Sequence, residues 1–218
     1  MAAPADLSET GMANGALSHI GEPPITSLDD TTRAAARYAK KFFAETRDDL
    51  LRERDWEFAR TDCTPAGVTC PNPHWAFRYT MPADCVNVLR IGDWDDSEDE
   101  PEWECPSTGD DVTVAIVLDT NEVAPHVYYT RRVVNPAQWD AGFRRLFKIA
   151  LAIALNPLIG RDKSLTAGLI NMLENKTGDA ERRDAQQRSG QQISRSTSWV
   201  RARFGFTAAN SGNWNGNS

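Results

Sequence analysis

The stretch WDAGFRRLFKIALAIALNP, residues 139–157, decides how this chain folds. Its apolar residues recur at the three- and four-residue spacing of one wide helical face. Asn135-Pro136 precedes it as a cap followed by a proline at the first helical position, and Asn156-Pro157 ends it. We therefore predict a helix that begins at Pro136 and needs other helices to cover its apolar face. That face consists of Trp139, Phe143, Leu146, Phe147, Ala150 and Ile153.

Three further helices are predicted to supply that cover. The first spans residues 7–20 and stops at Gly21, before Pro23-Pro24. The second runs as a long amphipathic helix to Trp56. The fourth should begin near Asp162. At the start of the second helix, the N-cap or first turn is expected to consist of Asp29, Asp30, Thr31 and Thr32. The fourth helix should bury one face, formed by Leu165, Leu169, Met172 and Leu173.

Between the helical segments, turn residues and short β-rich pieces predict an antiparallel sheet or small sandwich. Four strands are expected, over residues 75–81, 86–91, 112–118 and 126–134, and prolines punctuate them. The expected fold class is therefore α+β. A bundle of three to four helices from both ends of the chain surrounds an inserted small antiparallel β domain and is followed by an extended C-terminal tail.

The expected domain boundaries follow from this pattern. Residues 1–60 form the first part of the helical bundle, 61–134 the inserted β domain, and 135–192 the second part of the bundle. Residues 193–218 form a C-terminal docking tail, because their Ser-, Asn- and Gly-rich composition cannot build a core alone.

Charge divides unevenly along the chain, whose net charge is -7. Residues 139–218 hold 12 basic and 6 acidic residues, whereas residues 1–138 hold 12 basic and 25 acidic ones. An acidic part joined to a basic part suits oriented docking between protein surfaces, although two solvated faces explain it equally well. Residues 92–111 hold ten acidic and no basic residues, which predicts an exposed loop.

The chain lacks the usual signatures of enzyme chemistry. His19, His74 and His126 are far apart, and no phosphate-binding glycine loop or nucleophile motif is present. We therefore predict no catalytic residue, no metal site and no cofactor. Calcium or magnesium binding by the acidic loop stays open as a minor alternative.

The cysteines have no Cys-x-x-Cys spacing, so we expect them to be reduced and buried or half-buried. A disulfide between Cys63 and Cys70 stays open. The N-terminal residues lack the pattern of a secretory signal. No membrane span is expected, since the longest apolar run, residues 149–155, is too short to cross a bilayer.

Four motifs in a fixed order carry a resemblance to a known family. They are ALSHIGEPPI at residues 16–25, RDDLLRE at 47–53, WEFA at 56–59 and YTMPADC at 79–85. In this order they resemble the tail tubular protein A family of podophages, which are head-to-tail adaptors (connectors), and the related gene-transfer-agent adaptors. The resemblance covers most of residues 10–185.

The resemblance implies a structural virion protein and not an enzyme. It implies a homo-oligomeric ring, commonly dodecameric, between the portal protein and a tail nozzle similar to tail tubular protein B. Such a ring continues the DNA channel, and DNA passes through it during ejection without specific binding. The implied place is the virion neck or tail, after assembly in the host cytoplasm.

Three sets of residues receive roles as hypotheses. We expect Trp56, Phe58, Trp139 and Phe143 to form the structural core between helices and strands. An acidic channel- or tail-facing loop is expected from Asp93, Asp95, Asp96, Glu98, Asp99 and Glu100. Portal binding is expected from Trp199, Arg201, Arg203 and Phe204.

The alternative function is a virion-associated cell-wall hydrolase that uses carboxylates of the acidic loop with a metal. Acid–base hydrolysis needs two carboxylates at a fixed separation, which an exposed loop does not offer. The structural adaptor is therefore the main prediction.

Overall fold

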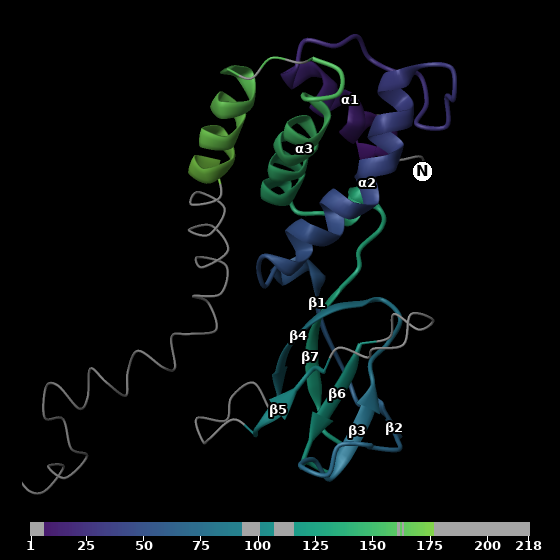
Figure 1. Cartoon of the computed structure of the whole chain (residues 1–218), viewed down its shortest axis with the longest axis vertical. Helices are drawn as coiled ribbons and strands as arrows, with labels where there is room; N and C mark the ends of the chain where they lie inside the picture. Colours follow the sequence, from purple (N-terminus) through teal and green to yellow (C-terminus); the bar gives the residue numbers. More distant parts are fainter. Residues whose placement is uncertain (1–6, 93–100, 107–115, 161, 163, 177–218) are drawn as a thin grey trace, which may run out of the picture. The chain divides into compact units, whose positions relative to one another are not determined.

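The computed structural model describes residues 7–92, 101–106, 116–160, 162 and 164–176 (Figure 1). The helices are α1 (Glu9–His19), α2 (Ala34–Arg52) and α3 (Ala141–Leu155), with the 3-10 turns η2 (Glu57–Ala59) and η3 (Pro136–Gln138) and a further helix over residues 164–176. The strands are β1 (Arg60–Cys63), β2 (Ala66–Val68), β3 (Phe77–Thr80), β4 (Cys85–Ile91), β5 (Trp103–Glu104), β6 (Val117–Thr120) and β7 (Val127–Arg131).

The predicted α+β class is confirmed. All seven strands lie between α2 and α3 in the chain and form two antiparallel sheets, with the orders β1-β7-β4 and β2-β3-β6-β5. Three of the predicted strands correspond to β3, β4 and β7 within a few residues, whereas β6 overlaps the strand predicted over 112–118 only at residues 117–118, and residues 112–115 lie outside the described part. The prediction missed β1, β2 and β5, because these strands are short and lack an alternation of apolar and polar residues.

The start of α3 differs from its prediction. Asn135 and Pro136 begin only the 3-10 turn η3, where the Asn135 side chain accepts a hydrogen bond from the Ala137 amide at 3.0 Å. Trp139 then has an extended backbone, with ψ of 145°. Asp140 caps the α-helix by accepting from the Gly142 amide at 2.6 Å. The helix therefore begins at Ala141, five residues later than expected.

The start of α2 was also predicted wrongly. Its N-cap is Arg33, which makes no side-chain cap hydrogen bond, and its first turn holds no acidic residue. The Asp30 carboxylate instead accepts from the Thr32 amide and hydroxyl at 2.9 and 2.6 Å, which closes a turn before the helix. These acidic residues belong to the connecting turn.

The N-terminal helix is held to the chain that follows it. Gly21 has a φ of +72°, a left-handed value that favours glycine and that ends α1. Asn14 then bonds both backbone groups of Ile25, at 3.0 Å to its carbonyl and 2.8 Å from its amide. These bonds fold residues 20–25 back along α1, which itself packs against α2 and α3.

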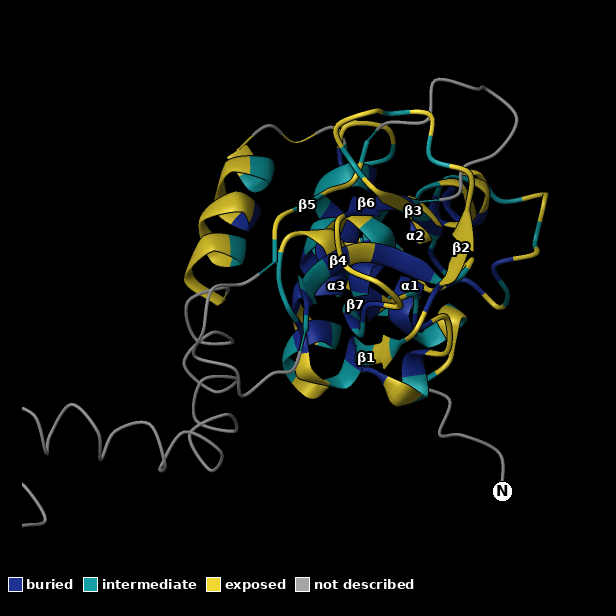
Figure 2. Cartoon of the chain, turned by 90° about the horizontal axis from the view of Figure 1, so that it is seen from below, coloured by how far each residue is buried: buried dark blue, intermediate teal, exposed yellow. Residues whose placement is uncertain are grey.

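Two groups of buried residues form the interior, and Figure 2 colours buried residues dark blue. In the helical part, α3 buries most of its apolar residues against α1 and α2. In the β part, the core brings together Tyr79, Met81, Cys85, Val88, Ile91, Leu118, Val127 and Tyr129.

The fourth helix, over residues 164–176, is only shallowly buried. It begins near Asp162, as predicted, and the carboxylate of this residue caps it by accepting from the Ser164 and Leu165 amides. The fully buried Asn156 amide donates to the Asp162 carbonyl and the Thr166 hydroxyl, at 2.5 and 2.7 Å. Of its predicted apolar face, Leu169 is buried but Met172 is 41% exposed, because this helix covers less of the bundle than its sequence pattern predicts.

Candidate functional site: the junction of helices and strands

The chain passes between its helical and β parts twice, and a buried tryptophan lies in each passage. Trp56 follows α2 on the way out, and Trp139 precedes α3 on the way back. Each indole N–H donates to a carbonyl six residues earlier, Trp56 to Leu50 at 2.8 Å and Trp139 to Val133 at 2.7 Å. Both side chains are thus fully satisfied in the interior, so each passage has a fixed path.

The two tryptophans belong to one aromatic cluster. Phe143 lies at its centre, with ring centroids 5.1 Å from those of Trp56, Phe58 and Trp139. Phe43 of α2 and Phe147 of α3 extend the cluster, at 4.7 Å from each other. Edge-to-face aromatic pairs contribute about 1 kcal/mol each beyond the area they bury. The cluster therefore ties both passages to the same pair of helices.

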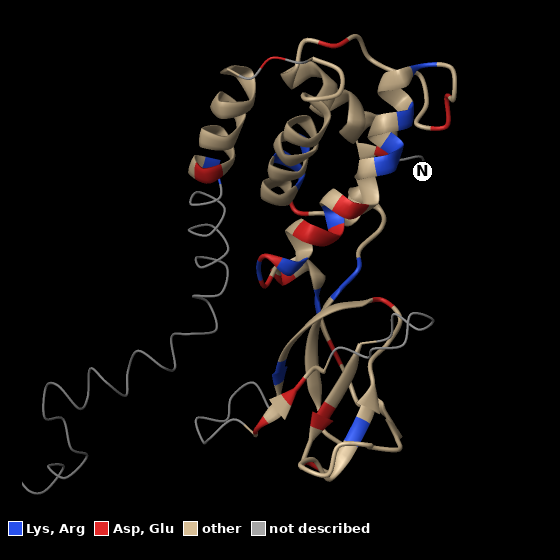
Figure 3. Ribbon diagram, in the orientation of Figure 1, with Lys and Arg blue, Asp and Glu red and all other residues tan. Residues whose placement is uncertain are grey.

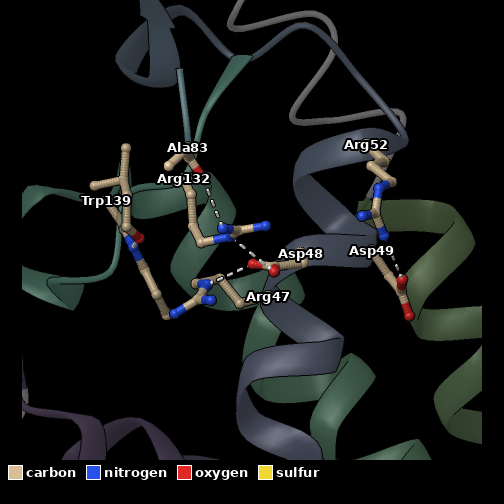
Figure 4. A network of polar contacts seen from close by, with 8 residues as sticks. Arg47, Asp48, Asp49, Arg52, Ala83, Arg132 and Trp139 are labelled. Atoms are coloured by element: carbon tan, nitrogen blue, oxygen red, sulfur yellow. Dashed lines mark hydrogen bonds and ion pairs between the residues drawn. The ribbon is translucent and has the colours of Figure 1, made fainter. Parts of the chain in front are cut away.

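A polar network lies beside this cluster (Figure 4). Asp48 of α2 accepts from Arg47 Nε at 2.8 Å through one oxygen and from Arg132 Nε at 2.9 Å through the other. Arg132 follows β7 and also donates to the Ala83 carbonyl at 3.2 Å. Its backbone amide donates to the Asp84 carbonyl at 2.6 Å. One carboxylate thus joins a helix to the end of β7 and to the turn before β4.

Burial makes this network stiff. The Arg47 side chain is only 8% exposed and that of Asp48 is 18% exposed, so solvent screens the pair poorly. The neighbouring pair Asp49–Arg52 lies on the same helix at 3.7 Å, with both side chains more than half exposed. The two pairs, both drawn in Figure 4, differ mainly in burial and in the link to Arg132.

A second ion pair fixes the first passage. Arg60, the first residue of β1, donates to both carboxylate oxygens of Asp55 at 2.7 and 3.1 Å. Its other terminal nitrogen lies 2.9 Å from Glu57 Oε2. The fork of a guanidinium matches a carboxylate in direction as well as charge. The link from α2 to β1 is therefore held from both sides.

Titratable groups of the β core are held neutral. Burial raises the pKa of Cys85 to about 12, with further contributions from Cys105, Cys63 and Asp84. Burial likewise raises the pKa of Tyr129 to about 12, and its hydroxyl donates weakly to Asp84 at 3.4 Å. Neither group supplies a nucleophile near neutral pH, because the reactive form of each is the ionised one.

Among the described residues, no group of three His, Cys, Asp or Glu side chains could hold a metal ion. His126 Nε2 lies 2.8 Å from Asp62 Oδ2, in a pair that is open to solvent. All four cysteines are free, and Cys105 is exposed, which contradicts the expectation that each is at least half-buried. No helix in the described part combines the length and apolarity that crossing a bilayer requires.

The predicted site residues fall into two groups. Trp56, Trp139 and Phe143 are buried and Phe58 is half-buried, all at the junction. Outside the described residues lie the acidic set Asp93, Asp95, Asp96, Glu98, Asp99 and Glu100 and the tail set Trp199, Arg201, Arg203 and Phe204.

A described part of the acidic segment forms a strand, contrary to its prediction as a loop. Residues Trp103–Glu104 form β5 and pair with β6, and the Glu102 carbonyl accepts from the Thr120 hydroxyl at 3.0 Å. Sequence reasoning also missed Asp48 and Arg132 as a pair. The RDDLLRE motif, residues 47–53, pointed to α2, but nothing local identifies a partner 84 residues away.

Comparison with known proteins adds one finding to this geometry. The family model described as Tube, tail tubular protein, matches residues 12–100. The matched segment includes most of α1 and all of α2 and β1 to β4, and thus Asp48, Trp56 and Ala83 of the junction. No curated protein matches the chain.

Proposed function

We propose, on the premise that residues 12–100 belong to the tail tubular protein family, that this chain is the head-to-tail adaptor of a phage virion. The family makes it a structural component of a phage tail. The proposal adds that its copies form a ring of twelve, the number common in the family that the chain resembles, between portal and tail nozzle. The family match is the observation that carries the proposal.

The junction suits such a structural role. A ring that joins two other assemblies transmits force between them, so its parts must keep a fixed relation. Here two chain passages, one aromatic cluster and the Asp48 network connect α2 and α3 to the β part. Buried aromatic packing and a poorly screened ion pair both resist bending. The junction is therefore better suited to keeping the two parts of the chain in a fixed relation than to converting a substrate.

The remaining parts of the proposal concern the division of the chain into domains and two segments that lie largely outside the described residues. Residues 61–134 serve as a β domain inserted between the two parts of the bundle, 1–60 and 135–192. The acidic residues 93–100 face the channel or the next tail ring, where negative walls let DNA slide during ejection without binding. Locating residues 93–111 on the outer rim of an assembled ring would contradict this role.

The C-terminal tail, residues 193–218, is proposed to dock on the portal. Trp199, Arg201, Arg203 and Phe204 are the types of residue that dominate protein interfaces. Removing residues 194–218 should therefore weaken portal binding at least tenfold in a titration. Unchanged binding would assign portal recognition to another surface.

Assembly is proposed to occur in the host cytoplasm, before the ring becomes part of the virion neck.

Native mass spectrometry of the full chain, alone and mixed with its portal protein, tests the proposal. The expected result is a closed oligomer whose mass is a multiple of 24.2 kDa, alone or on the portal. An unrelated ring protein at the same concentration is the matched control. A chain that stays monomeric and ignores the portal overturns the proposal. A parallel peptidoglycan assay, with and without divalent metal, would then test the hydrolase.

A further inference from the structure

One line of exposed charged residues along α2 has an unusual order, and the exposed Lys40 and Arg52 lie outside this line. Starting at Arg37 and stepping four residues at a time, the ridge reads Arg37, Lys41, Glu45, Asp49 and Glu53. All five residues are exposed. Residues four apart lie side by side along a helix, so these side chains form one continuous line. We call this line the α2 ridge.

The order of charges on the α2 ridge is unfavourable for the helix alone. Three of its four neighbouring pairs carry like charges, and only Lys41–Glu45 has opposite signs, in the weaker of the two orders. The positive charges also lie at the helix N-terminus and the negative ones at its C-terminus, which opposes the helix dipole. Figure 3 shows blue near the N-terminal end of α2, and red interspersed with blue toward its C-terminal end.

Few contacts within the described residues offset the repulsion between the like charges of the α2 ridge. Asp49 pairs with Arg52 at 3.7 Å in an exposed geometry, and Lys41 lies 5.5 Å from the Phe42 ring centroid. Within the part of the chain that the structure describes, Arg37 and Glu45 make no ion pair. The opposite face of α2 is buried through Ala35, Ala36, Ala39, Phe43, Leu50 and Leu51, so the ridge cannot turn inward.

We infer that the α2 ridge is a contact between two copies of this chain. The basic end of one ridge, Arg37 and Lys41, binds the acidic end of the next, Asp49 and Glu53. The partner is a second copy because the ridge is complementary to itself once shifted along its length. A shifted contact leaves one basic and one acidic end unused on each pair, so it propagates from copy to copy. This inference rests on the proposed ring and assigns a surface to it.

Charge reversal at each end separately tests the contact. Arg37→Glu with Lys41→Glu should reduce self-association at least tenfold, as should Asp49→Lys with Glu53→Lys, both measured by native mass spectrometry of the full chain. Matched controls reverse exposed charges elsewhere: Arg131→Glu with Arg145→Glu, and Glu122→Lys with Glu174→Lys. The controls should assemble like wild type. Thermal melting checks that every variant is folded.

Mixing the two reversed variants is the decisive measurement. Each variant keeps the normal charge at one end of its ridge. The reversed, acidic N-terminal end of Arg37→Glu with Lys41→Glu can bind only the reversed, basic C-terminal end of Asp49→Lys with Glu53→Lys. The mixture should therefore regain assembly, with the two variants alternating in equal numbers when one is labelled with a heavy isotope. Growth that stops at two copies would indicate an antiparallel pair and would overturn the shifted contact.

The failure of this inference can be told apart from failure of the adaptor proposal. If wild type assembles and the reversed variants assemble equally well, the contact lies elsewhere and the ring stands. If both reversed variants lose assembly but their mixture does not recover, the ridge contacts a different surface of the neighbouring copy, and the ridge-to-ridge contact is overturned. If wild type never assembles, alone or with portal, the ring and this contact are both overturned.

Discussion

Asp48 is the residue at which the helical and β parts are joined by charge. Its two oxygens are divided between Arg47 and Arg132, which come from α2 and from the end of β7. Arg47 is 6% exposed, so removing its partner would leave a guanidinium without compensation in the interior. One residue along the helix, Asp49 makes the same kind of pair at the surface.

Asp48→Asn should therefore destabilise the fold far more than Asp49→Asn. The first change should lower the free energy of unfolding by about 3 kcal/mol, since it breaks a mostly buried pair. The second should cost less than about 1 kcal/mol, because exposed pairs contribute little. Urea unfolding of both variants against wild type measures this. Equal losses would show that Arg132 is held by contacts other than Asp48.

Cys85 gives the fold a dependence on alkaline pH. Its folded pKa is raised by burial to about 12 from an ordinary value of 9.0. Below the ordinary value the thiol is protonated in both states and stability is unaffected. Above it, only the unfolded chain ionises, so the free energy of unfolding falls by about 1.4 kcal/mol per pH unit until the folded pKa is reached.

Cys85→Ala should remove the contribution of this thiol to the fall of the free energy of unfolding with rising pH. Urea unfolding between about pH 8 and about pH 11 would compare the variant with wild type. Tyr129, whose pKa is also about 12, still contributes its own share in both proteins. Val86→Ala truncates a buried, non-titrating side chain of the same strand, so it is the control and should keep the wild-type slope. A slope unchanged by Cys85→Ala would contradict the burial argument.

At the scale of elements, α3 shows how local and tertiary signals combine. Its apolar stripe fixes its helical nature, but Asp140 and not Asn135 caps it. The Trp139 indole must reach the Val133 carbonyl at 2.7 Å, and its ring must pack on Phe143. An extended Trp139 meets both demands, and the helix consequently starts after it.

Asp140→Ala should cost about 1 kcal/mol of stability, because the Gly142 amide loses its acceptor at the helix N-terminus. Asp140→Ser retains a capping oxygen and should stay within a few tenths of wild type. Thermal or urea unfolding distinguishes the two variants. If serine were as damaging as alanine, the carboxylate's charge and not its cap would matter.

At the scale of the whole molecule, one helix connects the fold to its proposed assembly. The buried side of α2 carries Phe43 and Leu51 into the core, and the α2 ridge occupies its exposed side. Near its C-terminal end, Asp48 reaches the β part through Arg132. A contact on the ridge would therefore act on a helix already fixed to both parts of the described fold.

Local pattern in the sequence determined the class of the fold and most of its elements. The apolar spacing of α2 and α3 and the turn residues between the strands are short-range signals, and they suffice for helices and antiparallel strands. The family resemblance likewise rested on motifs that are local in the chain, and the match over residues 12–100 agrees with it.

Only the tertiary structure decided what depends on distant partners. β1 is polar and becomes a strand because β7 pairs with it along Arg60–Cys63. Asp48 meets Arg132 across 84 residues, and the start of α3 follows from the packing of Trp139. Hydrogen bonds, ion pairs and ring contacts between distant segments exist only once the chain is folded, so no local window of sequence specifies them.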